Sequence, residues 1–193
     1  MKSGNIQESF RESSAILWRL ASDRAFHKKV ATAAARCVKA VGGGGKLIAF
    51  GNGGSAADAQ HFAGELVGRF ERERKALPAM AINTNVSVLT SICNDYGYAR
   101  IFERQLDALG RRGDVALAIS TSGNSENVNR ALKLAAKKGM YRIGLTGKTG
   151  GPMARLLDLE LRIPPTSTAR TQEAPIATIH ILCDLIESAF AKR

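Results

Sequence analysis

Residues 47–66 read LIAFGNGGSAADAQHFAGEL, and this stretch decides the fold. It begins with an apolar run typical of a short strand, passes through a turn of glycine and asparagine, and enters a helix that we predict to open at Ser55. The first N–H groups of such a helix have no partners within it, and glycine lets the backbone approach a ligand closely. The turn therefore predicts a cradle for an anion such as phosphate.

His61 and Glu65 lie four residues apart on this predicted helix, so both side chains leave the same face beyond the turn. Their spacing suits two ligands of one metal ion, or a base beside an acid. A polar pair on a surface helix has the same spacing, so these two residues alone leave both interpretations open.

Outward from this stretch, short apolar runs alternate with helical patterns. We predict strands over residues 46–50, 77–82, 115–120, 141–146 and 159–163, the last at an edge. We predict helices over residues 55–69, 87–93, 99–109, 128–138, 153–157 and 173–191, with a polar loop at Asn94 and Asp95. The alternation indicates an α/β fold in one domain, residues 1–193: an open five-stranded parallel sheet with helices on both faces. Ligands of such sheets bind beyond the carboxyl ends of the strands.

Residues 1–45 are expected to form a helical N-terminal extension of two helices, with Asp23 as a cap or turn between them. A long helical segment before the first strand has little to cover it within one small sheet. It packs either against a second copy of the chain, as a subunit interface, or back onto its own sheet. The sequence leaves both arrangements open.

A second loop, STSGNS at residues 120–125, follows the third predicted strand and leads into a helix. Its hydroxyls and N–H groups can surround a phosphate without a lysine, although Ser125 can also serve only as a helix cap. Both loops follow strands directly, so we expect them at the same edge of the sheet, as one site. Neither is a Walker A or GxGxxG motif, so no nucleotide cofactor is expected.

The bulk properties narrow the function classes. The 193 residues carry 28 basic and 17 acidic side chains, a net charge of +11, and 45% are hydrophobic. The basic residues are scattered, which favours an anionic substrate over nucleic acid. No run is long and apolar enough to cross a membrane, and no signal peptide is recognisable, so a cytoplasmic protein is expected. Cys37, Cys93 and Cys183 lack metal or disulfide spacing, and each is expected to be buried.

His180 lies in the apolar run of residues 176–182, where a histidine is more often buried and hydrogen-bonded than functional. Gln172 precedes the last predicted helix, whose first turn accommodates Pro175. Neither residue identifies a site by itself.

Taken together, the GNGGSAADAQH motif of residues 51–61, NDYG of residues 94–97, STSGNS, Gln172-Glu173 and His180 resemble the sugar isomerase (SIS) domain. Within it, nearly the whole chain is similar to the phosphoheptose isomerases. The resemblance implies conversion of sedoheptulose 7-phosphate to D-glycero-D-manno-heptose 7-phosphate through an enediol. This aldose–ketose isomerisation is the first step towards the ADP- or GDP-heptose precursors of lipopolysaccharide or capsule. It also implies a homotetramer with sites formed between subunits.

The resemblance also assigns residues. Glu65 would be the general base and His180 the general acid. One zinc ion per subunit would be held by His61, Glu65, Gln172 and His180. The substrate-binding set would be Asn52, Gly53, Gly54, Ser55, Glu65, Asn94, Asp95, Ser120, Thr121, Ser122, Ser125 and Gln172.

The geometry of the last helix complicates the zinc assignment. Gln172 and His180 are eight residues apart, about 12 Å along a straight helix, so they cannot both reach one ion from a single regular helix. Gln172 lies before the helix, or the two residues serve from different subunits. The Ala174-Pro175 pair also departs from the helix formers usual in the family, which leaves the place of Gln172 open.

Two non-enzymatic alternatives share the phosphate cradle. One is an SIS-domain protein that binds the replication initiator DnaA, in which the position matching His180 is not histidine. The other is a sugar-phosphate sensor, which would need a DNA-binding segment that residues 1–193 do not contain. Because this chain has His61, Glu65 and His180 together, the sequence favours the enzyme.

Overall fold

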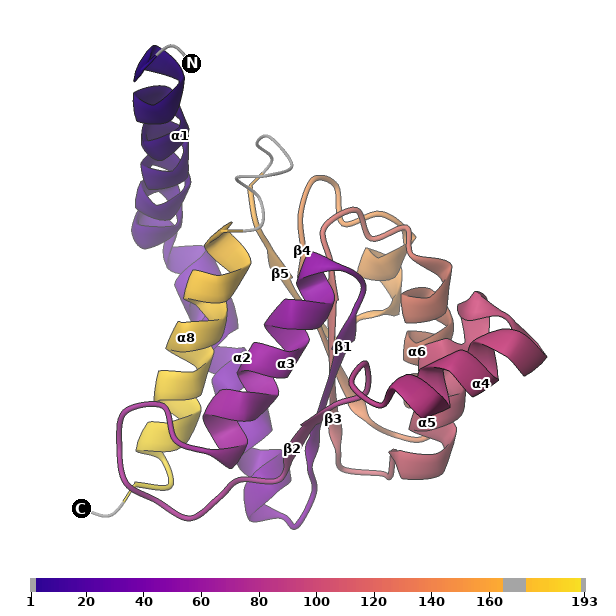
Figure 1. Cartoon of the computed structure of the whole chain (residues 1–193). Helices are drawn as coiled ribbons and strands as arrows, with labels where there is room; N and C mark the ends of the chain where they lie inside the picture. The colour runs from indigo at the N-terminus through magenta and orange to yellow at the C-terminus, as the bar shows by residue number, and fades with distance from the viewer. Residues whose placement is uncertain (1–2, 165–172, 192–193) are drawn as a thin grey trace.

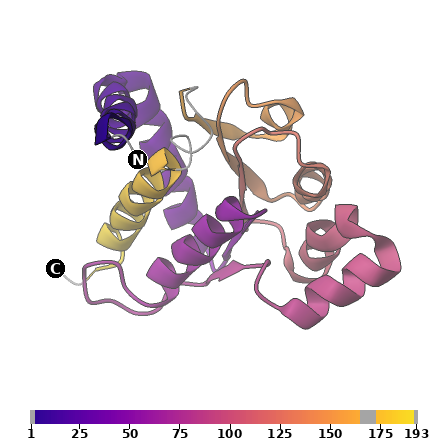
Figure 2. The same cartoon turned by 45° about the horizontal axis from the view of Figure 1, so that its top comes forward.

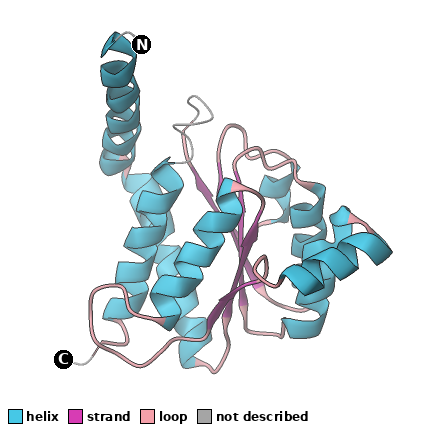
Figure 3. Ribbon diagram, viewed as in Figure 1, coloured by secondary structure: helices cyan, strands magenta, loops and turns pink. Residues whose placement is uncertain are grey.

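A computed structural model describes residues 3–164 and 173–191, and it shows a parallel sheet between two layers of helices (Figures 1 and 3). The strands are β1 (Leu47–Gly51), β2 (Ala79–Ala81), β3 (Val115–Ser120), β4 (Tyr141–Thr146) and β5 (Leu159–Arg162). They pair in the order β2-β1-β3-β4-β5, and every pairing is parallel. The predicted α/β class, five parallel strands and edge position of the fifth are confirmed.

The helices are α1 (Ser3–Ser22), α2 (Arg24–Gly42), α3 (Gly54–Val67), α4 (Val86–Tyr96), α5 (Ile101–Leu109), α6 (Glu126–Lys137) and α8 (Glu173–Ser188), with 3-10 turns η1 (Tyr98–Arg100) and η2 (Pro152–Leu156). Helices α2, α3 and α8 cover one face of the sheet, and α5 and α6 the other (Figure 2). Alternation along β1 feeds both layers: Leu47 and Ala49 join the first core, and Ile48 joins the second. A strand buried on both faces therefore reads as an unbroken apolar run.

Several predicted boundaries were wrong. Strand β2 is only three residues long and half-buried; Pro78 before it has no N–H to donate, and only its carbonyl bonds the sheet, accepting the Leu47 N–H at 2.9 Å. Asn94 and Asp95 lie in the last turn of α4, not in a loop, and Gly97, with φ of 80°, ends that helix. Residues 152–156 form a 3-10 turn where an α-helix was expected.

The two N-terminal helices take different places. Asp23 caps α2 as expected, its carboxylate accepting the N–H groups of Ala25 and Phe26 at 2.9 Å. Helix α2 packs onto its own sheet and α8. Most of α1 instead rises away from the domain (Figure 1), with Phe10 71% and Trp18 73% exposed. Helix α2 therefore folds back onto its own sheet. The C-terminal half of α1 also joins that core through Ile16 and Leu20, whereas Ile6, Phe10, Leu17 and Trp18 stay exposed.

The loop after α3 is fastened by a buried acid. The Glu187 carboxylate accepts the backbone N–H groups of Phe70, Glu71 and Arg72 at 2.7–2.8 Å. Arg74 lies 3.3 Å from the same carboxylate, and both side chains are fully buried. The Arg74 guanidinium also donates to the carbonyls of Glu65 and Gly68, at the end of α3. Glu187 therefore fixes both the loop and the C-terminal turn of the helix that carries Glu65.

The three cysteines differ in their burial. Cys37 and Cys183 are buried as expected, and burial raises the pKa of each thiol to about 12, so both stay protonated. Cys93 was expected to be buried but is exposed, because α4 turns it away from the core. None of the described helices is both long and apolar enough to span a bilayer.

Candidate active site

The turn after β1 is shaped by close packing. A side chain at Gly51 would meet the Ile119 carbonyl and Ser55 at 2.8 Å, so only glycine lets this turn lie against β3 and α3. Helix α3 begins at Gly54, one residue earlier than expected, and Gly53 caps it without a side-chain hydrogen bond. Ser55 therefore does not cap the helix, and its buried side chain lines a cavity instead.

The second loop turns its hydroxyls towards the same place. Ser125 precedes α6 as its cap residue, but its side chain accepts no N–H group of that helix. Instead its Oγ lies 3.3 Å from the Ser120 Oγ, which also accepts the Gly123 N–H at 3.2 Å. The Ser125 hydroxyl is thus available on the cavity side rather than consumed by capping.

Paired amides hold the two loops together. Asn52 and Asn127 each donate a side-chain N–H to the carbonyl oxygen of the other, both at 2.9 Å. The Tyr98 hydroxyl donates to the same Asn52 oxygen at 2.8 Å. A cavity of about 200 Å³, which we call the cradle, is lined by Asn52, Ser55, Ile119, Ser120, Thr121, Ser122, Ser125 and Lys148. The expectation that both loops form one site agrees with this arrangement.

Lys148 is a lining residue that the sequence analysis missed. It lies in the loop after β4, at the same carboxyl edge of the sheet, with φ of 48°. That loop packs tightly on the serine loop, since a Cβ at Gly123 would lie 1.9 Å from the Gly150 oxygen. The sequence did contain a signal for Lys148, because its loop directly follows a predicted strand and so lies at the ligand-binding edge of the sheet. The ammonium adds positive charge to a cavity of hydroxyls, which suits phosphate.

His61, Glu65 and His180 come together farther along α3, where this helix packs against α8. The Nε2 atoms of His61 and His180 lie 2.8 Å apart, joining α3 to α8 (side by side in Figure 1). The Glu65 Oε1 lies 3.3 Å from the same His61 nitrogen. All three are partly exposed, so they can reach a ligand. We call these three residues the acid–base cluster. In the contact between the two imidazoles one ring donates its N–H and the other accepts it, and the Glu65 carboxylate beside them can take up a proton.

The charges of the cluster act on neighbouring groups. Burial raises the pKa of Asp58, on the same helix, and the charge of His61 partly opposes that shift. Besides burial, the Glu65 charge raises the pKa of the Cys183 thiol. The Phe70 ring centroid lies 5.5 Å from that of His180. Cys183 is thus no nucleophile, and the loop fastened by Glu187 covers one side of the histidine.

The cradle and the acid–base cluster are well separated along α3. Seven residues separate Gly54 from His61 and eleven separate it from Glu65, which at 1.5 Å per residue is about 10 and 16 Å of rise. The chain of a seven-carbon sugar phosphate, at about 1.2 Å per bond, extends about 10 Å from C1 to phosphorus. One substrate in the cradle would thus barely reach the carboxylate of the same chain.

Other expected site residues lie elsewhere. Asn94 and Asp95 are exposed at the end of α4, hydrogen-bonded to each other at 2.8 Å, and line neither the cradle nor the hollow beside it. That hollow, about 300 Å³, adjoins Asn52, Gly53 and Cys93. Gln172 lies outside the described residues. The structure therefore unites the serine loop with Asn52 and Ser55, and separately unites the three residues of the cluster.

The donor set of the cluster can be compared with what zinc requires. Within residues 3–164 and 173–191, no three His, Cys, Asp or Glu side chains already form a metal site. In a tetrahedral site with Zn–N near 2.05 Å, two ligand nitrogens lie about 3.3 Å apart. The 2.8 Å between the imidazoles needs only a small rotation to reach that value. Two imidazoles and a carboxylate are donors that zinc accepts, so the residues fit the ion.

Comparisons with known proteins identify the family of the chain. A family model described as the SIS domain matches residues 10–147. The phosphoheptose isomerase of Geobacter sulfurreducens is 52% identical over 167 residues, 86% of this chain and 88% of that protein. That of Shewanella sediminis is 50% identical over 185 residues, 94% of this chain and 93% of that protein.

Solved structures are similar over the same span. A phosphoheptose isomerase from Francisella tularensis matches with a TM-score of 0.92 and 38% identity, over 97% of this chain and 100% of that one. The Neisseria gonorrhoeae phosphoheptose isomerase matches with a TM-score of 0.84 and 43% identity, over 96% of each chain.

Proposed function

Because this chain belongs to the SIS-domain family and, within it, to the phosphoheptose isomerases, we infer that it converts sedoheptulose 7-phosphate to D-glycero-D-manno-heptose 7-phosphate. It is an aldose–ketose isomerase of heptose biosynthesis. The observation that carries this function is the acid–base cluster, in which His180 meets His61 at 2.8 Å and Glu65 lies beside them. A protein that only held the sugar phosphate would not need that cluster.

The isomerisation moves one hydrogen between neighbouring carbons. We propose that the Glu65 carboxylate removes a proton from C1 of the ketose and returns it to C2, through an enediol. As the enediol forms, His180 gives a proton to the oxygen on C2. As the enediol collapses to the aldose, the neutral imidazole takes the proton of the C1 hydroxyl, so that negative charge does not build up on either oxygen. One carboxylate can serve both carbons, because they are neighbours and the sugar is held in register.

Substrate binding is assigned to the cradle. The phosphate is remote from the reacting carbons, so its binding orients the sugar without taking part in bond changes. Hydroxyls of Ser120, Ser122 and Ser125 and the ammonium of Lys148 are the proposed phosphate donors. Asn94, Asp95 and Gln172 remain proposed substrate contacts. The three free cysteines fit a reducing compartment, and we propose the cytoplasm as the place of the reaction.

The direct test is incubation of the purified protein with sedoheptulose 7-phosphate, followed by detection of the aldose phosphate. Turnover supports the isomerase. A tight complex with the replication initiator DnaA, without turnover, would support the non-catalytic alternative.

We propose that zinc binds to the acid–base cluster through His61, Glu65 and His180, with Gln172 as a fourth ligand. Held by these residues, a zinc ion would supply Lewis-acid polarisation of the sugar oxygens. We expect about one zinc per subunit in the protein, and its loss in His180→Gln, because one imidazole is removed from the donor set. Metal content is measured by elemental analysis after dialysis.

The third histidine provides the control for zinc. His27, on α2, contacts the Leu20 carbonyl far from the cluster in sequence, so His27→Gln should keep its zinc. Equal zinc content in both variants would remove His180 from the ligands. Activity before and after chelation, with zinc added back, then measures whether the reaction depends on the metal.

We also propose a homotetramer whose sites are completed between subunits. Two observations support it. The exposed apolar side chains of α1 adjoin a hollow of about 400 Å³ that is lined by α1, α2 and α8 and includes Leu17, Phe26 and Ile181. The rise of about 16 Å from the start of α3 to Glu65 puts the carboxylate at the limit of what one substrate in the cradle of the same chain would reach.

Subunit mixing tests the shared site. Glu65→Gln removes the base, and Ser122→Asp places a carboxylate in the cradle while still able to accept the Asn124 N–H. Each variant alone should be inactive. When they are coexpressed, we expect activity to return to about a quarter of wild type, because random pairing restores that share of sites.

The double variant Glu65→Gln/Ser122→Asp, coexpressed with Glu65→Gln, is the matched control and should stay inactive. If the first mixture also stays inactive while mixed oligomers form, the cradle and the carboxylate belong to one chain.

A further inference from the structure

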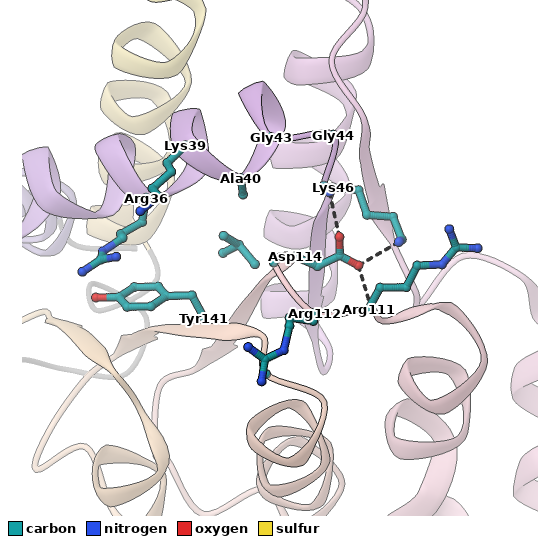
Figure 4. Close-up of a pocket in the computed structure, with 14 residues that line it drawn as sticks. Arg36, Lys39, Ala40, Gly43, Gly44, Lys46, Arg111, Arg112, Asp114 and Tyr141 are labelled. Carbon is teal, nitrogen blue, oxygen red and sulfur yellow. Dashed lines mark hydrogen bonds and ion pairs between the residues drawn. The ribbon is translucent and has the colours of Figure 1, made fainter.

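A second pocket lies at the opposite edge of the sheet from the cradle. It has a volume of about 410 Å³ and adjoins the amino ends of β1, β3 and β4, at Lys46, Val115 and Tyr141 (Figure 4). The cradle lies past the carboxyl ends of the same strands, and β3 alone, six residues long, spans about 20 Å. The two sites are therefore separate.

This pocket, which we call the basic pocket, carries five cationic side chains and one carboxylate. The cations are Arg36, Lys39, Lys46, Arg111 and Arg112. The carboxylate of Asp114 is almost fully buried and already committed: it accepts the N–H groups of Lys46 and Arg111 at 2.9 Å and the Lys46 ammonium at 2.7 Å. Asp114 thus joins the two loops and neutralises one lysine.

The other four cations have no such partner. Within the described residues, Arg36, Lys39, Arg111 and Arg112 form no ion pair, although Arg36 lies 4.7 Å from the centroid of the Tyr141 ring and its charge helps to lower the pKa of Asp158. Figure 4 shows Arg36 beside Tyr141 on one side of Asp114 and Arg111 beside Lys46 on the other. Five cations around one committed carboxylate leave an excess of positive charge, so an anion bound between them would relieve their mutual repulsion.

The cations are not needed to end α2 either. The N–H groups of Gly43, Gly44 and Gly45 already bond the last carbonyls of that helix, at 2.8–3.0 Å. The cationic groups converge from two segments distant in sequence, the end of α2 and the loop between α5 and β3. A single concave pocket of this kind suits a small anion, whereas nucleic acid requires an extended basic stripe.

We propose that the basic pocket binds a small-molecule diphosphate, separately from the sugar phosphate in the cradle. Two linked phosphate groups match both the number of unpaired cations and a volume larger than one phosphate fills. Arginine forks and lysine ammonium groups are the side chains that bind phosphate oxygens. This proposal does not depend on the isomerase activity, because it involves none of the residues of the cradle or the cluster.

The test is a calorimetric titration of the full-length protein with inorganic pyrophosphate at low salt. Saturating sedoheptulose 7-phosphate is included to fill the cradle. We expect pyrophosphate to bind at least about tenfold more tightly than phosphate, and Lys39→Gln/Arg112→Gln to weaken it by at least about tenfold. Lys28→Gln/Lys29→Gln, which removes the same charge from exposed positions of α2 outside the pocket, should bind pyrophosphate as wild type does.

Further measurements distinguish diphosphate esters from inorganic pyrophosphate and show which results would contradict the proposal. ADP carries the same diphosphate on a nucleoside. If ADP binds as tightly as pyrophosphate, the pocket is assigned to diphosphate esters. If ADP does not bind, the pocket is assigned to inorganic pyrophosphate. Lys39→Gln/Arg112→Gln should melt no lower than wild type without anion, because it relieves repulsion. Equal affinity for phosphate and pyrophosphate, equal affinity in the two double variants, or complete displacement by the sugar phosphate would overturn the proposal.

Discussion

Replacing Glu65 with glutamine is expected to lower kcat by about 10³-fold, while the KM for the sugar phosphate changes little. The amide keeps the size of the side chain but cannot take a proton from carbon. In the proposed site the cradle, and not the cluster, holds the phosphate, so uniform binding should survive. Steady-state kinetics with sedoheptulose 7-phosphate gives both constants.

Glu73→Gln is the matched control. Glu73 is an exposed glutamate in the loop after α3, and the same chemical change there should leave kcat at the wild-type value. The melting temperature of Glu65→Gln should stay near that of wild type, because the Arg74 guanidinium contacts the Glu65 carbonyl and not its side chain. Near-normal kcat in Glu65→Gln would remove this carboxylate from the mechanism.

Replacing Glu187 with glutamine is expected to destabilise the protein by roughly 3–5 kcal/mol, because it leaves the buried Arg74 guanidinium without a counter-charge. In wild type the carboxylate oxygens accept the backbone N–H groups of residues 70–72. In the variant the amide NH₂ would replace one of these oxygens, so that donor would face donor. For a chain of this length the melting temperature should fall by about 10 °C. Thermal and urea unfolding measure the change.

Asp184→Asn is the control for this variant. Asp184 lies on the same helix and pairs with Arg72, but both side chains are at least 40% exposed, so its loss should cost less than about 1 kcal/mol. Equal destabilisation by the two variants would mean that burial of the Glu187 pair is not what stabilises the loop.

Acid provides a second readout of Glu187. Burial alone would raise the pKa of this carboxyl, but three backbone N–H donors and Arg74 outweigh burial, and its pKa lies below the ordinary value of 4.5. Its contribution to stability is therefore complete above about pH 4.5 and is lost as the pH falls through the lowered pKa. The gap in melting temperature between wild type and Glu187→Gln should narrow in acid.

The central strands were predictable because β1 and β3 are buried on both faces. Residues 115–120 read as a short apolar run and residues 141–146 as a strand, and the structure confirms both ranges. The ends of helices were less predictable, because polar residues such as Asn94 and Asp95 occur in a last helical turn as readily as in a loop.

Contacts that join distant segments carried no local signal. The 2.8 Å contact of His61 with His180 joins residues that are 119 apart. Spacing along the chain could mark each histidine as a candidate, but it could not predict that the two are in contact. Lys148 was missed because no regular pattern marks its loop, and Glu187 because a buried acid in an apolar helix has no periodic signature. The loops of the cradle were predictable because each directly follows a central strand.

The paired amides of Asn52 and Asn127 have a consequence for how the sugar arrives. The two turns are locked to each other when the chain folds, so the entropy of closing them is already lost before any ligand is present. Binding at these two turns therefore does not cost that entropy a second time, so more of the interaction free energy appears as affinity for the sugar.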